Sequence, residues 1–141
     1  MTTTLTPNLM TEDVNASIDF YCNRLGFRFI VGVPTGSEEM VSGDPGKAPL
    51  RWAMLQREEA SLMFQARDSL AEEAQTFSHM PLGASATFYL EVANLDSLLE
   101  HVGEHTEVVV PERVTFYGMR EVWIRDNNGY VLTLAEKAAR P

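Results

Sequence analysis

The feature that most constrains the fold of this chain is an order of signals that occurs twice. Residues 9–27 (LMTEDVNASIDFYCNRLGF) and 90–108 (LEVANLDSLLEHVGEHTEV) each begin with a short alternating run and continue into an amphipathic stretch. Between the two parts stands a polar residue that can cap a helix, Asp13 in the first copy and Asn94 in the second. The apolar residues that recur at helical spacing are Val14, Ile18, Tyr21, Cys22 and Leu25, and then Leu95, Leu98, Leu99 and Val102.

The rest of each copy predicts strands. Apolar and β-branched runs follow both helices, and Pro or Gly separates them, as in the segment 126–129 (DNNG). Each half is therefore predicted to be a β-α-β-β-β unit. The expected strands are Leu9–Thr11, Phe27–Val33, Leu50–Gln56 and Ser61–Ala66, and then Phe88–Val92, Glu107–Val110, Arg120–Arg125 and Tyr130–Ala135.

Two such modules account for the whole chain. The first spans residues 1–66, the second spans 84–141, and a linker at 67–83 separates them. In the linker, Ser69 and Glu72 have the spacing of a capping box, which predicts a short helix. One sheet face of each module is too apolar to stand in water, so the modules must pair. We expect one α+β domain in which the paired modules form a curved mixed sheet around a cleft.

Composition narrows the classes of partner. The chain has 141 residues and a formal net charge of −9, which argues against binding to nucleic acid or to an anionic membrane surface and permits a cationic ligand. No apolar run approaches the roughly 18 residues of a membrane-spanning helix. The first residues lack a signal-peptide pattern, and the single cysteine, Cys22, can form no internal disulfide. We predict a cytoplasmic protein.

Three segments carry a resemblance to a known family. They are residues 13–27 (DVNASIDFYCNRLGF), the hairpin at 117–134 (YGMREVWIRDNNGYVLTL), and Pro7, six residues before Asp13. Together they resemble the vicinal oxygen chelate superfamily, which includes glyoxalase I, extradiol dioxygenases, fosfomycin-resistance enzymes and bleomycin-resistance proteins. The hairpin is most similar to the bleomycin-resistance branch. It departs from that pattern at Tyr117, Asn127 and Tyr130, where Trp, Pro and Asn are common.

The resemblance also indicates where a metal would bind. The enzymes of the superfamily hold a divalent ion, and their ligand positions fall here on Thr6, Thr87, Thr133 and one residue among Leu62, Met63 and Phe64. These residues cannot bind such an ion tightly. His79 lies in the linker, and His101 and His105 are expected on a solvated helix face. We predict no metal, no cofactor and no catalytic residue; Cys22 is expected to be a structural thiol.

Ligand binding does not require a metal, because aromatic side chains offer a stacking surface and lose little rotamer entropy when they become ordered. Tyr117 and Gly118 match ligand-facing positions of the related hairpin. Glu121 and Trp123 alternate with Val122 and Ile124, so only one set faces inward, and Glu121 could instead pair with Arg120 or Arg125. Trp52 and Trp123 could also be core or dimer-interface residues, and Phe64 and Phe88 could be core residues. The predicted ligand-binding residues are Trp52, Met54, Phe64, Phe88, Tyr117, Gly118, Met119, Glu121, Trp123 and Thr133.

Three functions fit the sequence. The first is a metal-free module that sequesters an aromatic or cationic small molecule. Here the resemblance implies a homodimer with clefts built by both chains, with or without exchanged modules, and antibiotic resistance of the bleomycin type as one use. The second is a metal-dependent lyase or dioxygenase of the same superfamily. The third is a regulatory protein that binds a protein partner through its dimer surface.

Overall fold

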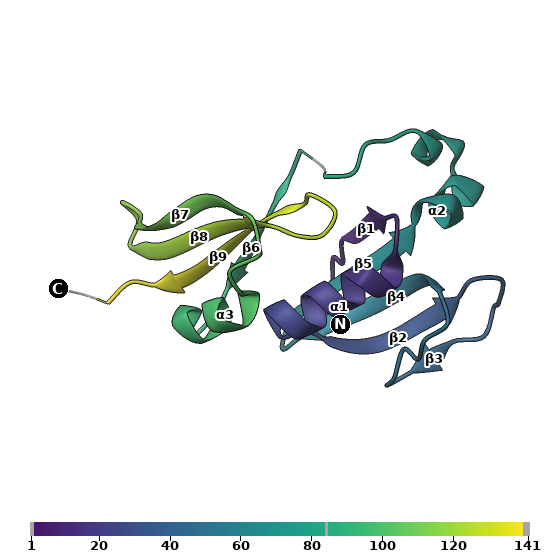
Figure 1. Cartoon of the computed structure of the whole chain (residues 1–141), viewed down its shortest axis with the longest axis horizontal. Coiled ribbons are helices and arrows are strands. Elements are labelled where there is room, and N and C mark those ends of the chain that lie inside the picture. The colour runs from purple at the N-terminus through teal and green to yellow at the C-terminus, as the bar shows by residue number, and fades with distance from the viewer. Residues whose placement is uncertain (1, 84, 140–141) are drawn as a thin grey trace. The chain divides into compact units, whose positions relative to one another are not determined.

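The chain forms two compact units, Met1–Met80 and Pro81–Pro141, and the computed structural model describes residues 2–83 and 85–139. Each unit is a mixed β-sheet with an α-helix packed on one face (Figure 1). The predicted α+β class, with a β-α-β-β-β order in each half, is confirmed.

The first unit contains a five-stranded sheet. Its strands are β1 (Asn8–Thr11), β2 (Arg28–Pro34), β3 (Val41–Ser42), β4 (Leu50–Arg57) and β5 (Ala60–Ala66), and helix α1 (Val14–Leu25) connects β1 to β2. The spatial order is β1-β5-β4-β2-β3; β1 runs parallel to β5, and the other pairs are antiparallel. The short strand β3 was not expected from the sequence, because it lies within the loop-like segment between Pro34 and Leu50.

The second unit repeats this arrangement with four strands. They are β6 (Thr87–Glu91), β7 (Val108–Val114), β8 (Met119–Arg125) and β9 (Val131–Lys137), and helix α3 (Leu95–Val102) connects β6 to β7. The spatial order is β6-β9-β8-β7, with β6 parallel to β9. It matches the order β1-β5-β4-β2 of the first unit, so the repeat in the sequence corresponds to a repeat in topology.

The helix ends follow the predicted signals. The Asp13 carboxylate accepts a hydrogen bond from the Ala16 amide (3.1 Å), and the Asn94 side-chain oxygen accepts one from the Ser97 amide (3.0 Å). Both residues are the N-caps of their helices, as predicted. Helix α1 ends at Gly26, whose φ of 74° is costly for residues with a Cβ atom.

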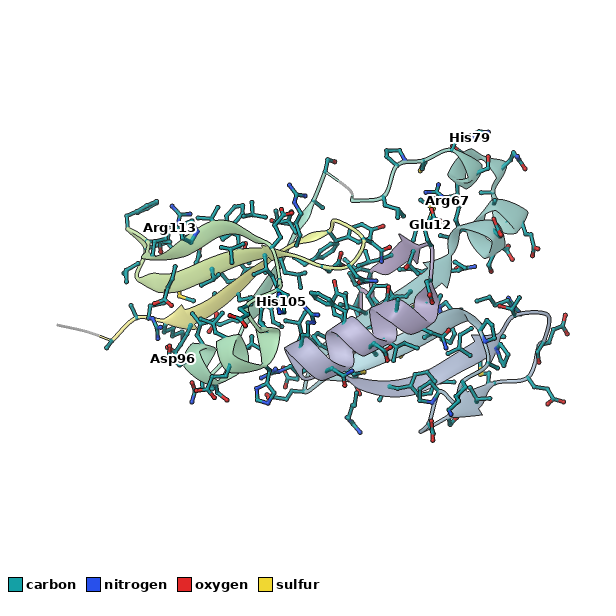
Figure 2. The ribbon with its side chains drawn as sticks, in the orientation of Figure 1. Glu12, Arg67, His79, Asp96, His105 and Arg113 are labelled. Atoms are coloured by element: carbon teal, nitrogen blue, oxygen red, sulfur yellow. The ribbon has the colours of Figure 1, made fainter. Side chains whose placement is uncertain are left out.

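The linker helix forms, but its predicted cap is wrong. Helix α2 (Arg67–Glu73) begins directly after β5, and its N-cap is Ala66, which provides no side-chain hydrogen bond. Ser69 is buried inside the helix and accepts a hydrogen bond from Gln65 (2.9 Å), so its hydroxyl is not free to cap. A 3-10 turn (Gln75–Ser78) follows. Arg67 binds Glu12 (2.7 Å) and the Met80 carbonyl (2.6 Å), which fixes this segment to the first unit (Figure 2).

In each unit the core lies between the helix and one sheet face. In the first unit, Tyr21 of α1 packs against Phe64 of β5 with ring centroids 4.9 Å apart, and both are fully buried. In the second unit, Leu95 of α3 and Ile124 and Leu134 of the sheet are fully buried. We call the opposite side of each sheet its helix-free face.

Candidate functional site

The orientation of strand β8 decides which predicted residues can act together. Val122 and Ile124 are buried and pair with Leu134 and Leu132 of β9, on the side of the core. Since successive side chains of a strand point to opposite faces, Glu121 and Trp123 lie on the helix-free face. The alternative that the sequence left open is thereby resolved.

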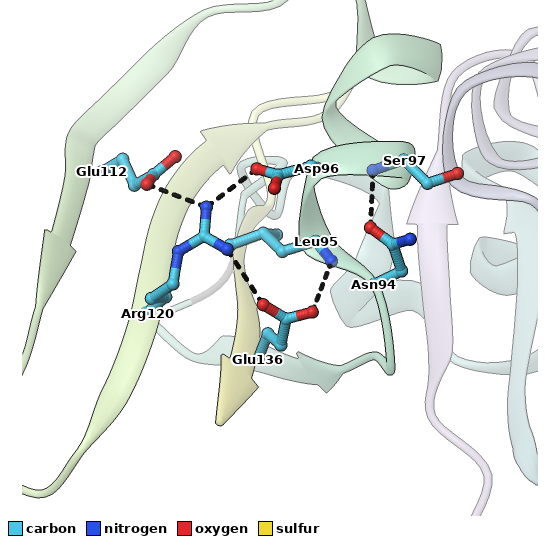
Figure 3. A network of polar contacts seen from close by, with 7 residues as sticks. All are labelled: Asn94, Leu95, Asp96, Ser97, Glu112, Arg120 and Glu136. Carbon is cyan, nitrogen blue, oxygen red and sulfur yellow. Dashed lines mark hydrogen bonds and ion pairs between the residues drawn. The ribbon is translucent and has the colours of Figure 1, made fainter. Parts of the chain in front are cut away.

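Arg120 lies on the α3 side and has other partners than Glu121. Its guanidinium binds Asp96 (2.8 Å), Glu112 (2.9 Å) and Glu136 (2.9 Å), and thus joins α3, β7 and β9 (Figure 3). Arg125 forms an ion pair with Glu107. The suggested pairing of Glu121 with Arg120 or Arg125 is therefore wrong.

Glu121 is instead the centre of a cluster on the helix-free face, the Glu121 cluster. Its side chain is fully buried, and one carboxylate oxygen, Oε2, accepts hydrogen bonds from the hydroxyls of Tyr89 (2.8 Å) and Tyr117 (2.6 Å). The other oxygen, Oε1, accepts one from the indole N–H of Trp123 (3.3 Å) and lies 3.9 Å from Nη2 of Arg113. Three aromatic rings thus converge on one carboxylate through their polar atoms.

Three elements bring these rings together. Tyr117 lies in the tight turn between β7 and β8, which Gly118 permits with a φ of 81°. Tyr89 lies on β6 and must reach across β9 to Glu121, over about 10 Å between strand axes. The β9 residues opposite Tyr89 and Glu121 are Thr133 and Ala135, which are small enough for a ring to pass above them.

The hydrogen bonds of the cluster hold the carboxylate in its charged form. Burial raises the pKa of Glu121, but the hydrogen bonds from Tyr117, Tyr89 and Trp123, together with the charge of Arg113, outweigh it and lower the pKa below its usual value. Burial and the hydrogen bond to Glu121 raise the pKa of Tyr89 to about 12. The hydrogen bond to Glu121 also raises the pKa of Tyr117. At neutral pH the cluster therefore contains an anion and two neutral phenols.

The rings remain accessible although the carboxylate does not. Tyr89 and Tyr117 are 51% and 53% exposed, and Trp123 is half-buried. Phe116, beside Tyr117 in the turn, is fully exposed, and the two rings meet edge to face at 5.0 Å. A molecule that approaches the cluster meets ring surfaces and not the carboxylate oxygens.

The other predicted residues of the second unit separate into two groups. Met119 is half-buried and shares the helix-free face with Glu121, as does Thr133, which pairs with Trp123. Phe88 pairs with Leu132 on the core side, and its ring lies 6.3 Å from that of Tyr130. Phe88 is thus half-buried on the core side of the sheet and does not join the cluster.

In the first unit, Trp52 and Met54 lie on the helix-free face. They are half-buried and share this face with Met63, which is opposite Met54 in the sheet. Amide side chains border them: Asn8 donates a hydrogen bond to Gln65 (2.9 Å). Phe64 is fully buried against α1, so the structure places it in the core and apart from Trp52 and Met54.

Two residues of the cluster were missed by sequence reasoning. Tyr89 had a usable signal, since it stands two residues after Thr87 in an alternating strand and must share its face. Arg113 had none, because irregularities in the β7–β8 register on both sides of Val110 shift the alternation of that strand. Figure 2 shows Arg113 on β7.

The donors present do not fit a divalent metal. Thr6, Thr87 and Thr133 offer neutral hydroxyls, where tight binding needs carboxylate, imidazole or thiolate groups. Within the part of the chain that the structure describes, no three His, Cys, Asp or Glu side chains are placed to hold a metal ion. His101 on α3 is exposed, and its Nδ1 lies 2.9 Å from the Ser97 carbonyl oxygen.

Cys22 has the surroundings of an unreactive thiol. It is half-buried on α1, and burial, followed by the charge of Asp19, raises the pKa of its thiol. A raised pKa reduces the fraction of thiolate, which is the nucleophilic form.

A separate hollow of about 900 Å³ lies in the first unit, beside the first turn of α1, helix α2 and the loop after β2. Carboxylates such as Glu12, Asp68 and Glu72 line it together with Lys47 and Arg51. It has no aromatic lining residue, so it offers charge without a stacking surface.

The two units share one strand order, and in each a helix follows the first strand. These features define a class of protein built from two β-α-β-β-β modules. The model of the Glyoxalase/Bleomycin resistance protein/Dioxygenase superfamily matches residues 4–134, and the chain belongs to this superfamily. None of the helices in residues 2–83 and 85–139 is long and apolar enough to cross a membrane.

Solved structures share the fold at low sequence identity. A protein of unknown function from Agrobacterium tumefaciens has a TM-score of 0.73 and 21% identity, over 97% of this chain and 95% of that chain. TioX from Micromonospora sp. ML1 has a TM-score of 0.66 and 16% identity, over 99% of both chains. A superfamily member from Sphaerobacter thermophilus has a TM-score of 0.69 and 15% identity, over 97% of this chain and 98% of that chain. No curated protein matches the sequence.

Proposed function

We propose that this protein is a metal-free binding protein that sequesters an aromatic or cationic small molecule. The observation that carries the proposal is the Glu121 cluster, in which Tyr89, Tyr117 and Trp123 are held in place by one buried carboxylate while their rings stay accessible. Rings fixed in this way lose little conformational freedom when a ligand stacks on them.

The residues at the metal-binding positions of the superfamily support the metal-free part of the proposal. Thr133 lies in the middle of the sheet, where its small side chain leaves room for Tyr89 above it. A glutamate at this position, as in the superfamily enzymes, would put a second carboxylate next to Glu121. Two like charges in one buried site oppose each other's ionisation.

The proposal includes a homodimer in the cytoplasm, and bleomycin-type antibiotics are one candidate ligand class. Support for the ligand class comes from the net charge of −9, which attracts cations, and from the ring surfaces, which suit planar or positively charged groups.

Native mass spectrometry of the purified protein tests the proposal. We expect a dimer mass without stoichiometric metal, before and after incubation with excess Ni²⁺ or Zn²⁺. The control is a His101→Ala, His105→Ala double variant, which removes adventitious binding by surface histidines. One metal ion per chain that the double variant still holds would overturn the metal-free proposal and favour a lyase or dioxygenase. Any additional mass that co-purifies is a direct lead to the ligand.

A further inference from the structure

We infer that Glu121 is the buried counter-charge of the ligand site and that the ligand is an organic cation held against the rings of Tyr89, Tyr117 and Trp123. This inference rests on the proposed function and narrows its ligand class. It follows from three features of the cluster: how the carboxylate is bonded, what its charge requires, and where Arg113 lies.

The bonding of Glu121 determines what a ligand can contact. Its two oxygens accept hydrogen bonds from three ring donors, and the side chain has no accessible surface. A ligand therefore gains no hydrogen bond from the carboxylate itself. It meets ring faces whose O–H and N–H groups already point at an anion. Cations are attracted to such faces by the ring quadrupole, and more strongly where water is excluded.

The charge on Glu121 is not required to hold the rings. A neutral glutamine oxygen could accept from the same hydroxyls, and burying a carboxylate is costly unless a charge balances it. Arg113 forms an ion pair with Glu121 at 3.9 Å, and its side chain is 52% exposed, so water screens part of its charge. The three ring hydrogen bonds stabilise the anion but add no positive charge, so a negative charge stays beneath the rings. This charge attracts a cation that stacks on the rings.

Two other charges of the described residues lie on this face. Glu91 of β6 lies on the same face as Glu121, with Ala135 of β9 between them. Lys137 of β9 lies beside Met119. One further negative charge and one further positive charge therefore flank the cluster. Among residues 2–83 and 85–139, Arg113 provides the positive charge paired with the carboxylate. Its guanidinium lies beside the rings and repels a second cation there, so its removal is expected to strengthen the binding of a cation.

A pair of matched probes tests this inference on the full-length protein. The cationic probe is 10-methylacridinium, and the neutral probe is 9-methylacridine, used in mildly alkaline buffer where it is uncharged. Calorimetric titration is expected to give at least about tenfold tighter binding of the cation, which corresponds to about 1.4 kcal/mol. Because the probes have similar size and ring area, the difference reports charge and not stacking.

Three variants separate the inference from a purely structural role. Glu121→Gln is expected to abolish the preference for the cation, and Arg113→Gln to increase affinity for the cation about threefold or more, since screening by a half-exposed charge is modest. Glu100→Gln removes a charge from the exposed side of α3 and is the matched control, with unchanged affinity for both probes.

Each outcome is decisive. Equal binding of both probes to the wild type would overturn the inference and leave the proposed function standing, whereas no binding of either probe would overturn both. If circular dichroism shows that the Glu121→Gln protein is unfolded, Arg113→Gln decides the matter, because an exposed arginine can be replaced without loss of the fold. Unchanged or weaker binding of 10-methylacridinium by Arg113→Gln contradicts the inference.

Discussion

At the residue scale, the Glu121 cluster depends on a carboxylate that stays ionised although it is fully buried. Its charge is stabilised by donors that in turn become harder to ionise, since a phenol that donates to a carboxylate resists loss of its proton. The lowered pKa of Glu121 and the raised pKa of the tyrosines share the same hydrogen bonds as a cause. The pKa values of the tyrosines therefore report on the state of Glu121.

Replacing Glu121 with Gln is expected to lower the pKa of Tyr89 from about 12 toward the ordinary value for tyrosine. The decrease is expected to be partial, because burial is a larger cause of the raised pKa than the hydrogen bond. Carbon-13 NMR of the labelled tyrosine rings measures it during an alkaline titration. Glu100→Gln is the control and should leave the titration unchanged. An unaltered pKa of Tyr89 in Glu121→Gln would show that the two groups are not coupled.

How much of the site the sequence could predict also depends on single residues. Tyr117 and Gly118 were named because they match ligand-facing positions of the related hairpin, and Glu121 and Trp123 because they alternate on a strand of the same hairpin. The face on which Glu121 lies could not be predicted, because both alternating sets of β8 contain apolar and charged residues, and burial against α3 decided between them. Phe64 was named as a ligand-binding candidate although a core position was favoured, and its packing against Tyr21 of α1 places it in the core.

At the element scale, the sequence predicted helices and strands well where a side chain acts on its own backbone. Asp13 and Asn94 were identified as caps by local chemistry alone, and both cap their helices. The same type of motif failed at Ser69, because β5 continues directly into α2 and tertiary packing buries the hydroxyl within the helix. Local signals are reliable where no packing interaction competes with them.

Replacing either cap residue tests this local contribution. Asp13→Ala and Asn94→Ala are each expected to reduce the free energy of unfolding by about 1 kcal/mol, since each leaves a first-turn amide without its acceptor. Urea denaturation measures the change. Asn23→Ala, on the exposed side of α1, is the control and should be neutral or slightly stabilising. Equal effects at Asn23 and Asp13 would exclude capping as the cause.

The ion-pair network around Arg120 connects three secondary-structure elements, whereas a helix cap acts within one element. Its guanidinium joins α3, β7 and β9 and is mostly buried, whereas Arg125 makes one exposed pair with Glu107. Arg120→Met is expected to cost about 1–2 kcal/mol of unfolding free energy, and Arg125→Met less than about 1 kcal/mol. Thermal and urea unfolding of the two variants provide the comparison. A smaller loss at Arg120 than at Arg125 would contradict a structural role for the network.

At the scale of the whole molecule, the repeat predicted the fold because two β-α-β-β-β units impose the same strand order twice. What it could not predict is the difference between the two helix-free faces. The first face carries the apolar side chains of Trp52, Met54 and Met63. On the second face, the aromatic side chains bind the charged carboxylate of Glu121. Topology is set by hydrophobic patterning, and the chemistry of a face is set by a few polar residues within it.

The net charge of −9 gives a last prediction that separates the whole molecule from its cluster. Long-range attraction accelerates the encounter with a cation and is screened by salt, whereas a buried charge acts at short range and mainly slows dissociation. We therefore expect the association rate of 10-methylacridinium to fall several-fold from low to high ionic strength, while that of 9-methylacridine stays constant.

Stopped-flow tryptophan fluorescence measures both rates. The Glu121→Gln variant should keep most of this salt dependence, because it changes one of many charges in the distant field. It should lose the slow dissociation, because it removes the anion to which the three ring donors bind. If Glu121→Gln instead altered the association rate alone, the preference for a cation would come from the overall charge of the protein. The rings of Tyr89, Tyr117 and Trp123 would then be a stacking surface without a counter-charge of their own.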